Sequence, residues 1–247
     1  MSRWIEGRVV ANRRWTNQLY SLQIDAQIGP FKAGQFTRLG LDIDGERVGR
    51  PYSFVNAPHE CYVEVYSITV PGGALSNRLF ELYPGDLVWV APKGAGFFTL
   101  SEVPEGRNLW MLSTGTALGP FLAMLKTDEP WDRFEKIVLA HAVRIAEELT
   151  YQDTIRKLLA VNPGQLIYVP FVSREDTEFA VKGRIPQAIE DGRLEERGGA
   201  GIRAEDSQVM LCGNPAMVDD TSEVLEARGL KKNKRREKGQ ITTENYW

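Results

Sequence analysis

The stretch "LWMLSTGTALGP" at residues 109–120 decides the fold of the second half of this chain. It opens with four apolar residues, and apolar side chains on both faces are typical of a strand inside a parallel sheet. A turn of small residues follows and leads into an apparent helix, where backbone N–H groups and the helix dipole can receive a phosphate. Strand, turn and helix in this order predict an α/β domain that binds its ligand at the strand end.

The same pattern continues towards the C-terminus. Three more apolar runs are "KIVLAHAV" (136–143), "LIYVPFV" (166–172) and "VMLC" (209–212). The spacing predicts helices over residues 145–161 and 215–230, with Gly229 placed where a C-terminal cap is expected. Together these segments predict a doubly wound parallel-sheet α/β domain over residues 101–247.

The first hundred residues have a different pattern. Short runs rich in β-branched and aromatic residues are separated by turn signals such as "VPGG" and "YPGD". The runs cover residues 14–24, 34–43, 61–70 and 86–92. This spacing predicts an antiparallel β-barrel or sandwich over residues 1–100.

Composition narrows the function classes. The 247 residues contain no apolar run long enough to span a bilayer, and charges interrupt the N-terminus, so we expect a cytoplasmic protein. Cys61 and Cys212 are the only cysteines, which excludes a cysteine-ligated iron–sulfur cluster or structural zinc site, so redox chemistry requires an organic cofactor. The net charge of −3 argues against general nucleic-acid binding. Without repeats or heptads, we expect a monomer.

Polar residues follow the apolar runs of the second half. Arg144, Ser173 and Arg174 come directly after two of them, Arg184 lies in "VKGRIP", and "GNPAM" (213–217) follows the last. A single arginine after a strand is usually a solvated surface residue. Three arginines and two phosphate-compatible turns at one sheet edge instead favour an anionic nucleotide, and the guanidinium fork suits a ribose 2′-phosphate.

Two stretches of the first half could hold a flat, phosphorylated ligand. In "RPYSF" (50–54), Tyr52 and Phe54 are either core residues or an aromatic face, Arg50 can pair with a diphosphate, and Pro51 restricts the segment to an edge or bulge. In "YSITVPGGALSNRL" (66–79), a glycine-rich turn precedes a helix start, whose N–H groups and Ser76 can hold phosphate oxygens.

Two features remain near the C-terminus. In the basic run "KKNKRREKG" (231–239), six of nine residues are basic, which indicates either a solvated loop or a landing site for an acidic carrier protein. The chain ends in Tyr246 and Trp247, and two large aromatic side chains need the core or a flat ligand to cover them.

Taken in order, "RPYSF", "GGALS", "STGTALGP", "SRE", "GRIP", "CGNPAMV" and "ENYW" resemble the bacterial ferredoxin (flavodoxin)–NADP reductases of the short enterobacterial type. The resemblance covers essentially the whole chain. It implies an FAD-binding antiparallel β-barrel followed by an NADP-binding α/β domain. It further implies hydride transfer between NADPH and FAD, and single-electron transfer between FAD and a ferredoxin or flavodoxin, which the basic run from Lys231 to Lys238 would attract.

The resemblance also implies residue roles. The FAD-binding residues would be Arg50, Pro51, Tyr52, Ser53, Tyr66, Ser67, Ile68, Thr69, Gly73, Ala74, Leu75, Ser76, Thr116, Tyr246 and Trp247. The NADP-binding residues would be Val143, Arg144, Ser173, Arg174, Arg184, Asn214 and Pro215. Ser53 would lie near the reactive flavin nitrogen, with Glu244 as a second hydrogen-bonding or proton-relaying group. Cys212 would lie near the nicotinamide, or be a buried structural residue.

Three alternatives stay open. One is a reductase serving an oxygenase, although the chain lacks the cysteines of a fused iron–sulfur segment. Another is an enzyme that releases its flavin, against which the aromatic tail argues. The third is a non-catalytic nucleotide-binding subunit, which the three arginines disfavour. Pro51 and Gly119 depart from the family's usual residues and bear on fine geometry only.

Overall fold

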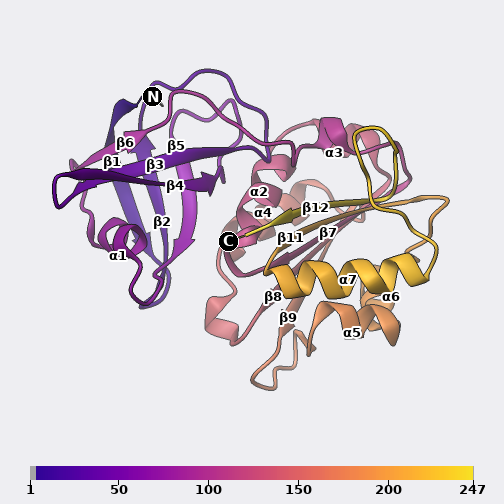
Figure 1. Cartoon of the computed structure of the whole chain (residues 1–247). Coiled ribbons are helices and arrows are strands. Elements are labelled where there is room, and N and C mark those ends of the chain that lie inside the picture. Colours follow the sequence, from indigo (N-terminus) through magenta and orange to yellow (C-terminus); the bar gives the residue numbers. More distant parts are fainter. Residues whose placement is uncertain (1–3, 247) are drawn as a thin grey trace. The chain divides into compact units, whose positions relative to one another are not determined.

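The computed structural model describes residues 4–246, which form two compact units (Figure 1). The first unit contains residues 4–99 and 119–127, and the second contains residues 100–118 and 128–246. Among the described helices, none is long and apolar enough to cross a membrane.

The first unit is an antiparallel sheet of six strands in the order β4-β3-β6-β1-β2-β5. The strands are β1 (Ile5–Arg14), β2 (Leu19–Asp25), β3 (Phe36–Ile43), β4 (Glu46–Ser53), β5 (Val63–Ile68) and β6 (Leu87–Val90). The two outermost strands meet, because Phe54 bridges to Val65 and the Val55 amide donates to the Glu64 carbonyl at 2.9 Å. The sheet therefore closes, and the predicted antiparallel barrel is confirmed.

Alternation along the strands explains the core of the barrel. Side chains such as Leu22, Ile24, Leu39 and Val90 point inward and are fully buried. Helix α1 (Ala74–Glu81) adds Leu75 and Leu79 to this core.

Residues 119–127 also belong to the first unit. They include all of helix α2 (Leu118–Leu125) except its first residue. A Cβ at Gly119 would come within 3.1 Å of Val55 Cγ2, a contact tighter than most real ones. The glycine therefore lets this helix lie close to the segment after β4.

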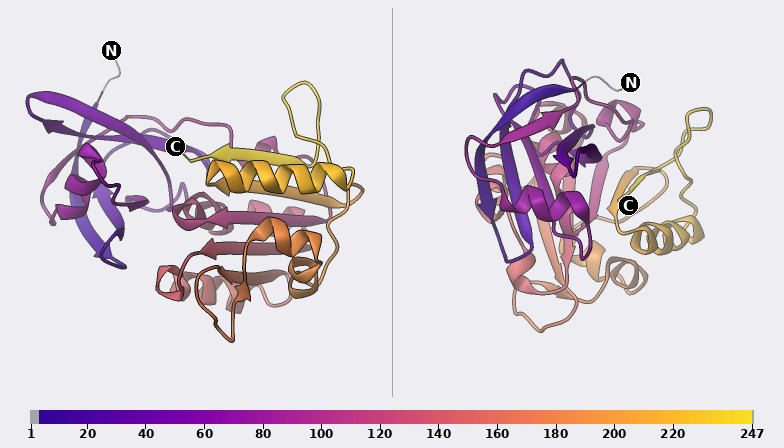
Figure 2. Two further views of the ribbon diagram at one scale, coloured as in Figure 1. Left: turned by 60° about the horizontal axis from the view of Figure 1, so that its bottom comes forward. Right: turned by 60° about the vertical axis from the view of Figure 1, so that its left-hand side comes forward.

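The second unit is a parallel sheet in the order β10-β9-β8-β7-β11-β12 (Figure 2). Its strands are β7 (Asn108–Thr114), β8 (Lys136–Val143), β9 (Leu166–Val172), β10 (Val181–Lys182), β11 (Ser207–Gly213) and β12 (Ile241–Asn245). The strand order reverses between β7 and β11, which makes their carboxyl ends the switch point where such sheets bind ligands. The predicted doubly wound parallel sheet is confirmed.

Helices cover this sheet and bury both of its faces. They are α3 (Glu129–Arg133), α4 (Gln152–Val161), α5 (Ile185–Glu190), α6 (Arg193–Gly198) and α7 (Pro215–Ala227). Helices α5, α6 and α7 share one apolar core with Trp110, Val138 and Leu211 of the strands. The alternate strand residues, such as Met111 and Leu139, are fully buried as well, as the continuous apolar runs predicted.

Two local predictions can be compared with the structure. The single helix expected over 145–161 is wrong, because a 3₁₀ turn (Ala146–Glu148) is followed by Tyr151 at φ 57°, and α4 begins only after it. The cap expected at Gly229 is confirmed: its φ is 89°, and Leu230 N donates to Leu225 O in a Schellman motif. Strands β1 and β12 were not predicted.

Candidate functional site

The predicted FAD-binding residues of the barrel gather where its two outermost strands meet, between the end of β4 and β5. We call this line of closure the seam. Tyr52 and Ser53 end β4, and Tyr66 and Ser67 lie in β5, the strand that the continuation of β4 joins. Burial raises the pKa of Tyr52 to about 12, so its phenol stays neutral. Within residues 4–246 the Ser53 hydroxyl, which is half-buried, makes no hydrogen bond, so both its donor and acceptor capacity remain for a ligand.

The glycine-rich turn after β5 ends at the start of α1. Gly73 occupies the N-cap, and no side chain in the described range caps this helix, so its first N–H groups are available to an anion. The Ser76 hydroxyl accepts from Val70 N at 3.1 Å and thereby folds the turn. Since that hydroxyl accepts, its proton can still be donated. Arg50 is exposed and donates to the neighbouring Gly49 carbonyl.

The predicted NADP-binding arginines lie together at the carboxyl edge of the parallel sheet. Arg174 N donates to Arg144 O at 2.8 Å, which makes the residues after β8 and β9 neighbours. Arg184 follows β10, whose register with β9 brings it to the same edge. All three side chains are exposed, and none makes a salt bridge with another residue of the range 4–246. Three guanidinium groups are thus available to one anionic ligand.

The switch point is built from the ends of β7 and β11. Gly213 has φ 138°, and a Cβ there would lie 2.1 Å from Thr114 Oγ1, so only glycine fits. The same Thr114 oxygen accepts from Asn214 N at 2.9 Å and joins the two turns. Asn214 then caps α7 through Ala216 N at 3.0 Å, with Pro215 as the first helical residue.

The buried Cys212 and the half-buried Glu244 lie side by side next to this point. They are register partners in β11 and β12, and Tyr246 hydrogen-bonds with the Cys212 side chain. Burial, followed by the nearby Glu244 charge, raises the pKa of the Cys212 thiol well above its usual value, and the Tyr246 bond opposes this. Burial also raises the pKa of Glu244 to about 7. At neutral pH this carboxyl can therefore either give or take a proton.

The tail continues the sheet. Strand β12 pairs with β11, and Tyr246 N donates to Gly213 O at 2.9 Å. The Tyr246 backbone is therefore fixed at the switch point. The position predicted for Trp247 lies outside the described residues.

Comparison with known proteins agrees with this arrangement. Residues 14–97 match an oxidoreductase FAD-binding domain and residues 111–223 an oxidoreductase NAD-binding domain. The chain is 48% identical over 248 residues, covering both chains fully, to a flavodoxin/ferredoxin–NADP reductase of Escherichia coli (strain K12). A crystal structure of a ferredoxin NADP+ reductase from Neisseria gonorrhoeae with bound FAD and NADP has TM-score 0.94, 30% identity and full coverage of both chains.

The chain belongs to the flavodoxin/ferredoxin–NADP reductase family. At greater distance, a ferredoxin–NADP reductase of Pseudomonas aeruginosa is 37% identical over 240 residues, which cover 94% of this chain and 92% of that protein.

Two residues that the sequence did not single out make hydrogen bonds at the ends of these parallel strands. Thr114 lies in the turn of small residues, two positions after the apolar run ends at Leu112, and this position was the only local sign of it. Its hydrogen-bond partner Asn214 lies 100 residues later in the sequence, so the contact itself could not be predicted. His141 lies inside an apolar run and contacts Gly115 O through Nε2 at 3.0 Å.

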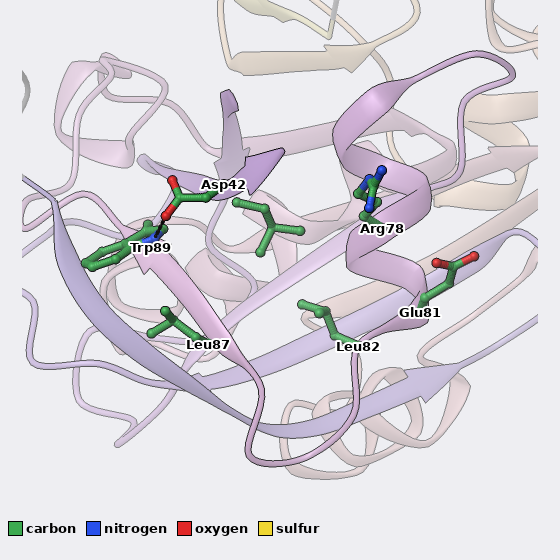
Figure 3. A pocket seen from close by; sticks show the side chains of 7 residues that line it. Asp42, Arg78, Glu81, Leu82, Leu87 and Trp89 are labelled. Atoms are coloured by element: carbon green, nitrogen blue, oxygen red, sulfur yellow. Dashed lines mark hydrogen bonds between the residues drawn. The ribbon is translucent and has the colours of Figure 1, made fainter. Parts of the chain in front are cut away.

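A pocket of about 350 Å³ on the barrel belongs to neither set of residues (Figure 3). Arg78 and Glu81 of α1 line one side, and Asp42 and Trp89 line the other, joined by a hydrogen bond of 3.0 Å. None of the predicted site residues lines this pocket.

Proposed function

We propose that this reductase transfers a hydride between NADPH and FAD and single electrons between FAD and a ferredoxin or flavodoxin. The observation that carries the proposal is the edge of the parallel sheet, where three exposed arginines, without an ion pair inside residues 4–246, accompany two turns at the switch point. A nucleotide with a 2′-phosphate and a pyrophosphate matches both features. The full-length similarity to reductases of this family supports it.

In the barrel, the residues of the seam hold FAD. The N-terminus of α1 and Arg50 neutralise its diphosphate, and Tyr52 offers a neutral aromatic face. The Ser53 hydroxyl, which has no partner among the described residues, hydrogen-bonds the flavin. When bound, FAD supplies hydride and one-electron chemistry, and the protein supplies position and electrostatics.

In the α/β unit, different residues along the sheet edge bind different parts of NADP. Arg144, Ser173, Arg174 and Arg184 bind the 2′-phosphate, while the turns after β7 and β11 receive the rest of the dinucleotide. Glu244, with its pKa near 7, holds or moves the proton that accompanies electron transfer. Cys212, buried beside it, shapes the nicotinamide site as a thiol rather than as a thiolate.

The test is an anaerobic absorbance titration of the purified protein, with NADPH in one cuvette and NADH in another. Bleaching of bound flavin at an NADPH concentration about a hundredfold below that of NADH is the expected result. Bound flavin that shows no preference would overturn the role of the arginines and favour the reductase of an oxygenase. Purification without flavin would overturn the FAD site and favour the enzyme that releases it.

The basic run gives the reductase a second charged feature. It forms a short hairpin that Asn233 ties down, donating to Glu102 O at 2.8 Å and Thr242 Oγ1 at 3.1 Å, while its lysines and arginines remain exposed. Because the run precedes β12, it lies at the amino-terminal edge of the sheet, about 16 Å of strand away from the cofactor edge. Its proposed role is therefore to attract an acidic carrier and speed association, with no part in hydride transfer.

Charge reversal tests this role. With Arg235→Glu and Arg236→Glu together, reduction of an acidic carrier should slow about tenfold at low salt and converge with the wild-type rate at high salt. Lys157→Glu, an exposed lysine on α4, is the control. Equal salt dependence in all three proteins would refute the landing site. The same proposal includes a cytoplasmic monomer, which size-exclusion chromatography and fractionation test.

A further inference from the structure

His141 is a fully buried side chain to which the proposed function gives no task. It lies in β8 as the register partner of Ser113 in β7, and its exposed fraction is 0%. Its Nε2 is 3.0 Å from the carbonyl oxygen of Gly115, the first residue of the turn that follows β7. The imidazole therefore reaches from one strand to the turn at the end of its neighbour.

The hydrogen-bond partner fixes the form of the ring. A carbonyl oxygen only accepts, so Nε2 carries the proton and donates it. Burial lowers the pKa of His141 to about 4, partly opposed by this bond, so the ring is neutral at physiological pH. Nδ1 is then an acceptor, and it is buried without a hydrogen-bond partner in the part of the chain that the structure describes.

An unpaired buried acceptor destabilises a protein, and an apolar side chain of similar size would avoid that cost. What the imidazole adds at this position is the Nε2–H bond to Gly115. That carbonyl also accepts from Leu118 N at the start of α2, and Gly115 itself has φ 54°. The neighbouring Ser113 hydroxyl donates to Ala140 O at 2.9 Å. Two side-chain bonds thus fasten the end of β7 and its turn to β8.

We infer that His141 is a positioning residue, which holds the turn of residues 115–117 in the orientation that receives the pyrophosphate of NADP. The inference rests on the proposed function, since it assigns the turn to that ligand. An N–H group can stabilise a phosphate only if its peptide plane already faces the ligand, and the Gly115 carbonyl sets the plane that it shares with the Thr116 N–H. His141 therefore acts on NADP through the backbone, whereas the arginines contact the 2′-phosphate themselves.

The test compares two ligands on the FAD-loaded protein by isothermal titration calorimetry. NADP+ carries the pyrophosphate, and adenosine 2′-phosphate carries only the part assigned to the arginines. His141→Met keeps the volume and removes the donor, while His141→Gln keeps an N–H at a similar reach. Tyr168→Phe is the matched control, because it removes a different bond of the same unit, from Gln152 Nε2 at 3.0 Å.

We expect the NADP+ Kd of His141→Met to rise about tenfold and that of adenosine 2′-phosphate to change less than about twofold. His141→Gln should return NADP+ binding to within about threefold of the wild-type value, and Tyr168→Phe should leave both ligands unaffected. Unchanged NADP+ binding in His141→Met with a lower Tm, or equal weakening of both ligands, would overturn the inference. If His141→Met does not fold, His141→Asn replaces it, since its amide is too short to reach.

A failure of the proposed function gives a different result. Wild-type protein that binds neither NADP+ nor adenosine 2′-phosphate would overturn the nucleotide site itself, before any variant is compared.

Discussion

The barrel and the parallel sheet build their cofactor sites in different ways. In the barrel, the residues proposed to bind FAD lie in strands β4 and β5 and at the start of α1. In the α/β unit, most of the residues proposed to bind NADP lie one or two positions past the ends of parallel strands. The first site therefore depends on closure of a barrel, and the second on turns that share one edge.

The two sites should therefore depend on different parts of the protein, the main chain in one and side chains in the other. At the sheet edge, Gly213, Thr114 and Gly115 set the backbone that the proposed nucleotide would meet, so main-chain geometry should be the sensitive feature. In the barrel the strands hold the backbone already, and single side-chain groups such as the Ser53 hydroxyl should matter instead. Substitutions at the two sites ought to differ in kind.

The largest effect is expected at the switch point. Gly213→Ala places a methyl group 2.1 Å from Thr114 Oγ1 at φ 138°, where side chains are strained. We expect a loss of about 3–5 kcal/mol in unfolding free energy, together with loss of NADPH oxidation. Urea unfolding and steady-state kinetics measure the two effects.

Gly229→Ala is the matched control. Its φ is also positive, at 89°, but no atom lies within 4 Å of the added Cβ. It should cost about 1–2 kcal/mol and leave turnover unchanged. If both variants lost the same stability, the contact with Thr114 would not restrict the switch point, and the contrast with the barrel would weaken.

The sequence revealed more of the sheet edge than of the barrel seam for a physical reason. Arg144, Ser173 and Arg174 directly follow apolar runs, and parallel strands place such positions on one edge whatever the details. The meeting of residues 50–54 with β5 depends on the Phe54–Val65 bridge, which no local pattern specifies. There the motif and the family resemblance, rather than periodicity, indicated the site.

Residues with long-range roles were the ones that sequence reasoning missed. Strand β12 is short and partly polar, and it exists because β11 offers an edge for pairing. His141 is a polar residue inside an apolar run, with a partner that depends on the turn after another strand. Both could be recognised only in the tertiary structure. The sequence of β12 is equally compatible with a loop, and the run that contains His141 is compatible with an ordinary core strand.

The second effect concerns stability against pH. The pKa of His141 is about 4 in the folded protein and about 6.5 in an unfolded chain, so between these values the unfolded state binds the additional proton. Stability should therefore fall as pH drops from about 6.5 to 4, by about 3 kcal/mol from this group. Urea unfolding across that range should show a flatter profile for His141→Gln. His59→Gln, which changes an exposed histidine in the barrel, should keep the wild-type slope.

The third effect tests whether the arginines at the sheet edge bind the nucleotide through their side chains. Arg184→Ala removes a guanidinium group that no intramolecular salt bridge occupies within the described chain. We expect the KM for NADPH to rise about 10- to 100-fold, the usual range for hydrogen bonds to a charged group, with the KM for NADH little changed. Arg156→Ala, which breaks an exposed pair with Asp153 on α4, is the control. Equal weakening of NADPH and NADH would show that Arg184 supports the turn instead of the 2′-phosphate.

The smallest effect should appear in the barrel, where one hydroxyl is changed and the backbone stays in place. Ser53→Ala removes a group with no partner inside the described protein, so the fold loses little and FAD should remain bound. If that hydroxyl hydrogen-bonds the flavin during the reaction, anaerobic stopped-flow should show hydride transfer slowed about tenfold. Ser21→Ala, a barrel serine bonded to Trp15 Nε1 at 2.7 Å, should do the reverse, lowering Tm without slowing the transfer. Unchanged transient kinetics in Ser53→Ala would mean that the barrel, like the sheet edge, acts through its backbone. The two cofactor sites would then both depend on main-chain geometry, and the contrast between them would be lost.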